Sequence, residues 1–198
     1  MLIPFDTIKV IQAAAVLLKT ESSGCMSRLR LLKLLYIADR EYIQEKARPI
    51  TGDSVVAMDN GPVLSSVYDM IKGRDAGAVD WQAYLTSSGI LVQLKSDPGV
   101  GKLSRQEIAK LQDVAGRFRD QDDWDVAEYT HTFEEWLKNK PPKGSSKRIP
   151  LDDVLAATGR LNQKESLLEE ERRQHRVESF FRNATNAAAG PQTAFAKV

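Results

Sequence analysis

Few side chains in this sequence are of the types that carry out enzyme chemistry. The chain has two histidines, His131 and His175, and one cysteine, Cys25. His131 is followed by Thr-Phe-Glu-Glu and so lacks the second histidine of the helical zinc motif. Cys25 and His131 can in principle form a nucleophile and its base, but a lone cysteine is more often part of a core.

Other catalytic and cofactor motifs are also missing from the sequence. It contains no Gly-x-Ser-x-Gly nucleophile elbow, no phosphate-binding P-loop and no dinucleotide-binding glycine loop. We therefore expect no catalytic residue, no metal site, no cofactor and no enzyme activity. The remaining enzymatic alternative is a hydrolase that uses His131 with a nearby carboxylate.

Three aspartates surround a turn-rich segment and admit two interpretations. Asp39, Asp53 and Asp59 can converge into a carboxylate site, or each can cap a turn and pair with Arg40 or Arg48. Carboxylates near turns more often have the second role. We therefore expect these aspartates to be structural.

Composition limits the class of protein. The chain has 198 residues, 42% hydrophobic and 28% charged, with a net charge of +1. This suits one core-forming domain with an appendage, and it supplies no overall field to attract nucleic acid or an anionic membrane. One cysteine excludes an internal disulfide, and no run approaches the roughly 20 apolar residues of a membrane span. We expect a cytoplasmic protein without a membrane partner.

Nucleic-acid binding remains a secondary hypothesis. Residues 138–148 are basic and expected to form a loop, but they lack interleaved aromatic residues and no helix-turn-helix is recognisable. The alternative function is therefore a DNA-binding regulator of its own operon. The aromatic side chains are expected mostly in the core rather than at an interface; they are Trp81, Trp124, Tyr129, Phe133 and Trp136.

The periodicity predicts a mostly helical α+β fold, in which a central buried helix is surrounded by helices with a small antiparallel hairpin or sheet. The central helix covers residues 27–46, with Ser27 as its cap. Further helices are expected at residues 6–20, 62–72, 104–118, 122–131 and 149–158, with one further short turn at residues 132–138. Ser104 and Glu107 form a capping-box pattern at the start of the third of these helices. A hairpin is expected over residues 81–85 and 90–95, and residues 54–58 form a strand or extended coil.

Two surfaces are candidates for contact with a partner protein. The first is the narrow polar stripe of the central helix, made of Arg30, Lys33, Arg40, Glu41 and Gln44, with the apolar Ile37 lying within it. The second is the thin apolar seam of a charged helix at about residues 160–182, namely Leu168, Val177, Phe180 and Phe181. Residues 183–198 are expected to form a frayed tail.

Several rare motifs occur in a fixed order along the chain. They are Leu31-Leu-Lys-Leu-Leu-Tyr-Ile-Ala-Asp39, Arg48-Pro-Ile-Thr-Gly-Asp53 and Ala57-Met-Asp-Asn-Gly-Pro-Val63, followed by Leu103-Ser to Glu107, the segment from Trp124 to Trp136, and Gly144 to Gly159. Over residues 5–160 this pattern resembles the SocA-like Panacea antitoxin domain. Leu64 departs from it, because many relatives have proline there.

The resemblance implies a non-enzymatic antitoxin that neutralises a co-encoded toxin by direct binding. It also implies possible action as a proteolytic adaptor, with a cellular protease as a second partner, and a homo-oligomer is a further expectation. We expect residues 1–160 to form the antitoxin domain and residues 161–198 to form a helical extension with a flexible tail.

The family's motif residues have two competing interpretations. They either maintain the scaffold or face the toxin, and the scaffold role is favoured because a domain that serves diverse toxins must vary its contact surface. The residues concerned are Asp39, Arg48, Pro49, Thr51, Gly52, Asp59, Gly61, Pro62, Trp124 and His131.

Overall fold

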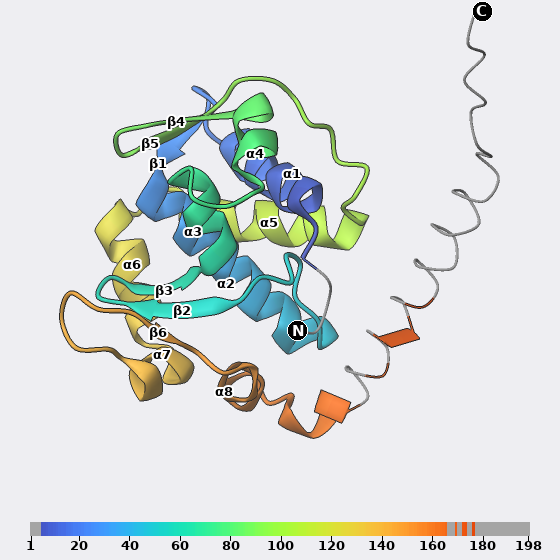
Figure 1. Cartoon of the computed structure of the whole chain (residues 1–198), viewed down its shortest axis with the longest axis vertical. Helices are drawn as coiled ribbons and strands as arrows, with labels where there is room; N and C mark the ends of the chain where they lie inside the picture. The colour runs from blue at the N-terminus through green and yellow to red at the C-terminus, as the bar shows by residue number, and fades with distance from the viewer. Residues whose placement is uncertain (1–4, 166–168, 170–171, 174–175, 177–198) are drawn as a thin grey trace, which may run out of the picture.

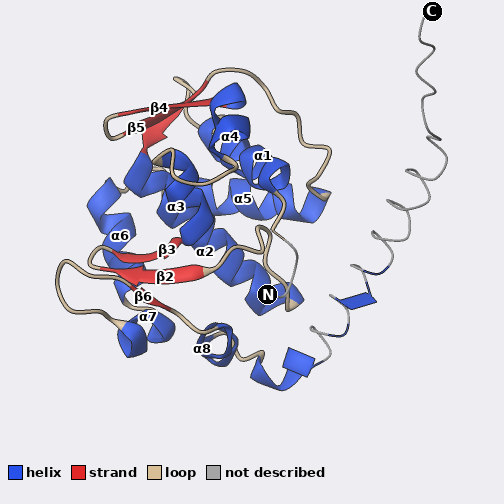
Figure 2. Cartoon of the chain, in the orientation of Figure 1, coloured by secondary structure: helices blue, strands red, loops and turns tan. Residues whose placement is uncertain are grey.

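The central helix organises the molecule. The computed structural model describes residues 5–165 together with residues 169, 172, 173 and 176. Within these residues the fold is mostly helical, with two small three-stranded antiparallel sheets, and the predicted fold class is confirmed. Helix α2 (Arg28–Lys46) runs through the middle, with helices and both sheets arranged around it (Figures 1 and 2).

The two ends of α2 follow from local sequence. The Ser27 hydroxyl accepts the backbone N–H of Arg30 at 3.0 Å and so caps the first turn, as predicted. The helix ends where Ala47 adopts a left-handed conformation with φ of 59°, two residues before Pro49. Between these ends the leucine-rich face is buried, including Leu31, Leu34 and Leu35.

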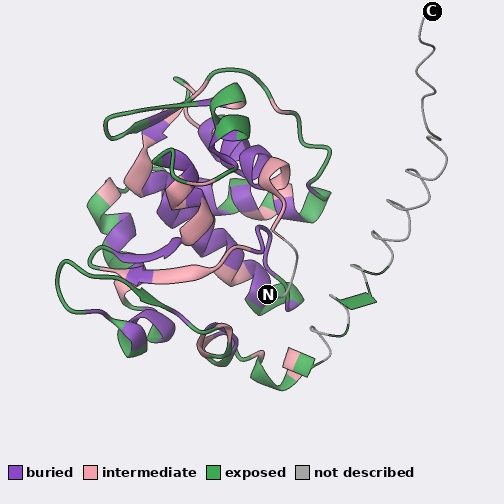
Figure 3. Ribbon diagram, viewed as in Figure 1, coloured by how far each residue is buried: buried purple, intermediate pink, exposed green. Residues whose placement is uncertain are grey.

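Helix α1 (Thr7–Leu18) lies beside α2 and is buried along most of its length (Figure 3). Asp6 caps its first turn through a 3.0 Å bond from the backbone N–H of Lys9. Helices α2, α4 (Ala78–Tyr84) and α5 (Arg105–Arg117) all pack against it. The wide apolar surface of α1 is thus covered on more than one side.

The first sheet joins β1 (Cys25–Ser27), β5 (Leu91–Leu94) and β4 (Leu85–Ser88), in that order. The predicted hairpin exists, but its first strand begins at Leu85, because Trp81 and Tyr84 belong to α4. The hairpin pairs with β1, a strand that the sequence did not predict. A three-residue strand is too short to produce a periodic signal.

The second sheet joins β3 (Gly61–Leu64), β2 (Val55–Met58) and β6 (Lys147–Arg148). Here two predictions were wrong. Pro62 lies in β3 rather than in the first turn of a helix, and helix α3 (Ser65–Ile71) begins three residues later, where Asp53 caps it. Lys147 and Arg148 were expected in a loop, but tertiary pairing with β2 extends them into a strand.

The remaining helices complete the shell. Both α5 and α6 (Asp123–His131) begin with a capping box, at Ser104 and at Asp122. The sequence predicts the first of these two capping boxes. α7 (Glu134–Asn139), α8 (Leu151–Ala157) and the 3-10 turn η1 (Leu161–Gln163) follow. Ile43, Trp136, Ile149 and Leu155 belong to a small second core that joins α2, α7 and α8.

Several predictions concern residues beyond this description. Leu168, Val177, Phe180 and Phe181 lie outside the described residues, as do most of the predicted charged helix and the whole predicted tail. Among the helices that the structure does describe, none has the length and apolar character needed to cross a membrane.

Candidate functional site

The polar stripe of α2 turns inward. Arg30, Lys33 and Ile37 are buried, so the expected exposure of these residues was wrong, while their contact with a partner protein stays a prediction. The Arg30 guanidinium donates to the carbonyl oxygens of Phe118 at 2.6 Å and Gln121 at 2.9 Å, just beyond the end of α5. The periodicity of one helix does not reveal this burial. Both α5 and α6 pack against the side of α2 that the sequence pattern leaves polar.

Arg40 connects α2 to α7 through a buried acid. Its Nε donates to Glu135 Oε1 at 2.7 Å, and the hydroxyl of Tyr36 donates to the same oxygen at 2.7 Å. The guanidinium also lies 4.2 Å from the ring centre of Phe133. Burial, reinforced by the charge of Glu135, raises the pKa of Tyr36 well above its usual value. Arg40 is therefore occupied within the fold.

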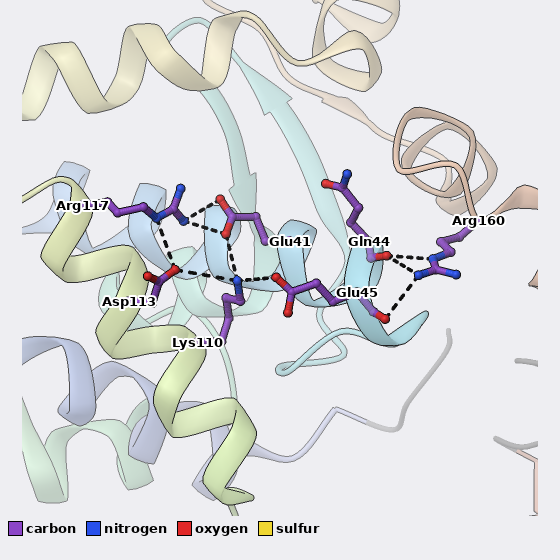
Figure 4. A network of polar contacts seen from close by, with 7 residues as sticks. All are labelled: Glu41, Gln44, Glu45, Lys110, Asp113, Arg117 and Arg160. Carbon is purple, nitrogen blue, oxygen red and sulfur yellow. Dashed lines mark hydrogen bonds and ion pairs between the residues drawn. The ribbon is translucent and has the colours of Figure 1, made fainter.

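Glu41 belongs to a charged network between α2 and α5 (Figure 4). It lies 2.6 Å from Arg117 and 3.2 Å from Lys110, and Lys110 also reaches Glu45 at 2.6 Å. At the end of α2, Arg160 Nε donates to the carbonyl oxygen of Gln44 at 2.8 Å. Like Arg40, Glu41 is half-buried and serves contacts inside the molecule.

Asp39 anchors the loop that follows α2. Its carboxylate accepts the backbone N–H groups of Ile50 at 2.8 Å and Thr51 at 2.9 Å, and the Thr51 hydroxyl donates to it as well. Burial raises the pKa of Asp39 to about 6, while these hydrogen bonds act in the opposite direction. Asp39 and Thr51 are buried, and the arrangement fixes the turn through Pro49 and Gly52.

The other two aspartates also cap turns. Asp53 lies close enough to Asp39 for its charge to raise the pKa of Asp39, and both line a second, smaller pocket, whereas Asp59 lies in the β2–β3 turn. Asp53 accepts the backbone N–H groups of Ser66 and Val67 at 3.1 and 3.0 Å, and Asp59 accepts that of Gly144 at 2.8 Å. The predicted pairing with arginine is absent among the described residues. Arg48 instead lies 5.8 Å from the ring centre of Tyr42.

A cavity of about 590 Å³ lies beside the first half of α2. The β2–β3 turn, α6 and the β4–β5 turn surround it and lie on one side of the molecule (Figure 1). Most of its wall is apolar, and the residues concerned are Leu29, Leu32, Met58, Val63, Tyr68, Ile90 and Trp124. Trp124 is 61% exposed and Ile90 69% exposed, so both offer apolar surface to solvent.

Charged and polar groups also line this cavity. They are Ser27, Arg28, Lys33, Asp59, Asn60, Asp123, Ser145 and Ser146, and the backbone of Gly61 and Gly144 completes the wall. The cavity thus brings together Asp59, Gly61 and Trp124 from the predicted motif set. Its size and mostly apolar lining are typical of binding sites.

Lys33 is the most unusual residue of the wall. Its side chain is 0% exposed, yet its Nζ has a single hydrogen-bond acceptor among the described residues, the carbonyl oxygen of Pro62 at 2.8 Å. No described carboxylate forms an ion pair with it. Burial lowers the pKa of Lys33 to about 7, because a charged ammonium loses its hydration there.

Gly61 makes room for this lysine. Its φ of 95° is unfavourable for residues with a side chain, and a Cβ there would lie 2.8 Å from Lys33 Nζ and 2.5 Å from Thr130 Oγ1. The glycine is therefore required both by the turn and by the close approach of the lysine. Asp59 and Asn60 form the two-residue loop before it.

His131 lies at the end of α6, behind the cavity wall. Its ring stacks on Trp136 with centroids 4.4 Å apart, and Trp136 Nε1 donates to the carbonyl oxygen of Met58 at 3.1 Å. Burial lowers the pKa of His131, and the charge of Lys33 acts in the same direction. Its buried Nε2 has no hydrogen-bond partner among the described residues. The backbone of Asn60 acts on the pKa of His131 in the opposite direction to burial.

The sequence placed Lys33 on a candidate contact surface but not in the interior, although a signal for its burial was present. A lysine inside the run Leu31-Leu-Lys-Leu-Leu35 has apolar neighbours on every side of the helix, which favours burial. The remaining motif residues Asp39, Arg48, Pro49, Thr51 and Gly52 lie along the second half of α2 and its loop, away from the lining of the large cavity.

The described residues offer little support for a metal site or for a nucleic-acid contact through the basic segment. No group of three His, Cys, Asp or Glu side chains is arranged to hold a metal ion there. In the basic segment, Lys138 pairs with Asp153 at 2.5 Å and Lys140 lies 5.0 Å from the ring centre of Trp136. These two lysines thus contact the protein itself.

Comparison with protein families gives a match to one of them. Residues 31–137, just over half of the chain, match the family described as "Antitoxin SocA-like, Panacea domain". Searches of curated proteins and of solved structures found no match. The matched region contains most of α2, both turns of the motif set and α6, and these elements supply much of the cavity wall. The chain belongs to the SocA-like Panacea antitoxin family.

Proposed function

We propose that this protein neutralises its cognate toxin by direct, stoichiometric binding, and that the mouth of the large cavity is the contact site. The family gives the protein a toxin–antitoxin role in general, and hence a toxin as the expected class of partner. We infer the contact site from the apolar cavity and from the exposed side chains of Trp124 and Ile90 beside it.

The distribution of exposed apolar groups supports this location. Tryptophan is enriched among the residues that dominate binding energy, and such residues work best beside a pocket that excludes water. Trp124 is presented from the first turn of α6, where Asp122 accepts its backbone N–H at 2.8 Å. Trp124 therefore projects from a capped helix, so the backbone that presents it loses little conformational freedom on binding.

The other motif residues fit a scaffold role. Asp39, Thr51 and Asp53 spend their hydrogen-bonding groups on the turn and on the start of α3. They are unavailable to a partner without unfolding that turn. Trp124 differs from these turn residues, because it is a motif residue that lies at the cavity and is exposed to solvent.

Co-expression with the product of the adjacent gene tests the proposal. That protein should arrest growth alone and be harmless beside the wild-type antitoxin, and Trp124→Ala should restore toxicity and weaken complex formation by roughly 30-fold or more. Leu137→Ala is the matched control, because Leu137 is 56% exposed but does not line the cavity. Full neutralisation by Trp124→Ala would place the contact elsewhere.

The level of the toxin in the same cells distinguishes blocking of the toxin from its delivery to a protease. We propose blocking, for which the toxin level is unchanged or raised when the antitoxin is present. If the protein instead delivers the toxin to a cellular protease, the half-life of the toxin must shorten. A toxin that stays active beside the wild-type protein would contradict both routes.

A further inference from the structure

The wall of the large cavity contains a buried cation whose counter-ion the described part of the chain does not supply. Lys33 Nζ contacts one acceptor, the carbonyl oxygen of Pro62, although a protonated amine has three N–H groups to donate. Burying an ammonium without a paired charge is strongly unfavourable. Lys33 is nevertheless 0% exposed and belongs to the wall of a cavity of about 590 Å³, so an anion in the cavity reaches Nζ only when the groups that cover it move.

The neighbours of Lys33 do not compensate this charge. From β3 it meets the Pro62 carbonyl and the Gly61 backbone, and from α6 it faces Thr130 and the ring of His131. Asp59 in the β2–β3 turn and Asp123 in α6 line the same cavity, as do Arg28 from α2 and Tyr68 from α3. Neither aspartate lies within ion-pair distance of Lys33. Asp59 accepts from Gly144, and Asp123 lies 3.7 Å from Arg30.

We propose that the cavity receives an apolar segment of the toxin that carries an acidic side chain, and that the carboxylate of this side chain pairs with Lys33. This inference rests on the proposed function. The cavity is larger than any single side chain and its wall is mostly apolar, so several residues of a protein segment are needed to fill it. The acidic side chain then supplies the missing counter-ion.

Pairing with an acid makes toxin binding depend on pH. Burial lowers the pKa of free Lys33 to about 7, and a carboxylate beside the amine raises it again. At pH 8.5 the free amine is mostly neutral, so formation of the complex takes up close to one proton. His131 does not obscure this uptake, because its pKa is lowered from 6.5 and it is already neutral. Wild-type affinity should fall by up to about tenfold per pH unit above 7.

Calorimetry tests this inference with the full-length protein and the toxin that co-expression identifies. Titrations at pH 8.5 in buffers of different ionisation enthalpy measure the protons taken up. Lys33→Met should weaken binding roughly 10- to 100-fold at pH 7 and abolish the proton uptake. Lys19→Met is the matched control, because Lys19 is half-exposed, pairs with Asp97 and does not line the cavity.

A second variant tests the contribution of the cavity to binding independently of the charge of Lys33. Ser146 is exposed and lines the cavity, so Ser146→Trp should obstruct it and weaken binding without removing the proton linkage. Replacing the acidic residues of the toxin one at a time by their amides should then identify the partner, since one replacement loses its effect when Lys33 is already methionine.

The outcomes distinguish this inference from the proposed function. A folded Lys33→Met protein that binds the toxin as tightly as wild type, or a wild-type complex that takes up no proton, overturns the inference and leaves the antitoxin role intact. If Lys33→Met does not fold, the wild-type proton uptake decides alone. A wild-type protein that does not bind the toxin overturns the proposed function itself.

Discussion

Two buried ionisable side chains on the same helix, Lys33 and Asp39, have opposite surroundings. Asp39 accepts two backbone N–H groups and one hydroxyl from the loop that follows α2. Lys33 has a single acceptor and a cavity beside it. Burial alone therefore does not mark a functional residue. The informative feature is a buried polar group with incomplete partners next to space that a ligand can fill.

The contrast between these two residues predicts the largest loss of stability for a substitution at Asp39. Asp39→Ala leaves three buried donors without an acceptor, so the free energy of unfolding should fall by about 3–5 kcal/mol. Urea denaturation at pH 7, followed by circular dichroism, measures the change. Asp39→Asn keeps one oxygen acceptor and should lose less. If Asp39→Ala loses under about 1 kcal/mol, the carboxylate is not the anchor of the loop.

On the Lys33 side, Gly61 provides the next largest effect. Gly61→Ala places a Cβ against Lys33 and Thr130 at positive φ, and should lower the free energy of unfolding by about 2–4 kcal/mol. Gly73→Ala is the control, since Gly73 also has positive φ but nothing within 4 Å of its added Cβ. Equal losses in the two variants would show that backbone strain, and not crowding of Lys33, explains the Gly61 effect.

The pH dependence of stability isolates Lys33 itself. Its pKa is lowered from 10.5 to about 7 on folding, so the unfolded chain binds more protons between these values and stability from this group rises with pH. Lys33→Met should remove about 2 kcal/mol of the stability change between pH 7 and pH 9. Parallel denaturation curves of both proteins at each pH provide the test, and identical pH profiles would mean that Lys33 stays protonated in the free protein.

The smallest effect is expected in the exposed network between α2 and α5. Arg117 is 42% exposed where it meets Glu41, and water and salt screen such pairs. Arg117→Ala should lower the free energy of unfolding by less than about 1 kcal/mol, and 1 M salt should reduce the difference further. A loss comparable to that of Asp39→Ala would require the network to be treated as part of the core.

Local sequence was sufficient where the signal lies within one element. The Ser27 cap, the capping box at Ser104 and the leucine periodicity of α2 each depend on residues a few positions apart, and the structure agrees with them. Predictions failed where distant partners decide the outcome. Strand β1 exists because it pairs with β5, and Pro62 is extended because β2 pairs with it, although Asn60-Gly61-Pro62 is also compatible with a helix start.

The sequence by itself determined the central helix, its caps, the mostly helical fold class and the family resemblance that residues 31–137 confirm. Only the tertiary structure decided which polar residues of α2 face protein and which face a cavity. The reason is physical, because the helix period places Lys33 and Arg40 on a polar stripe but does not specify what packs against it. Here β3 and α6 cover Lys33 and leave a cavity beside it, whereas α7 supplies Glu135 to Arg40.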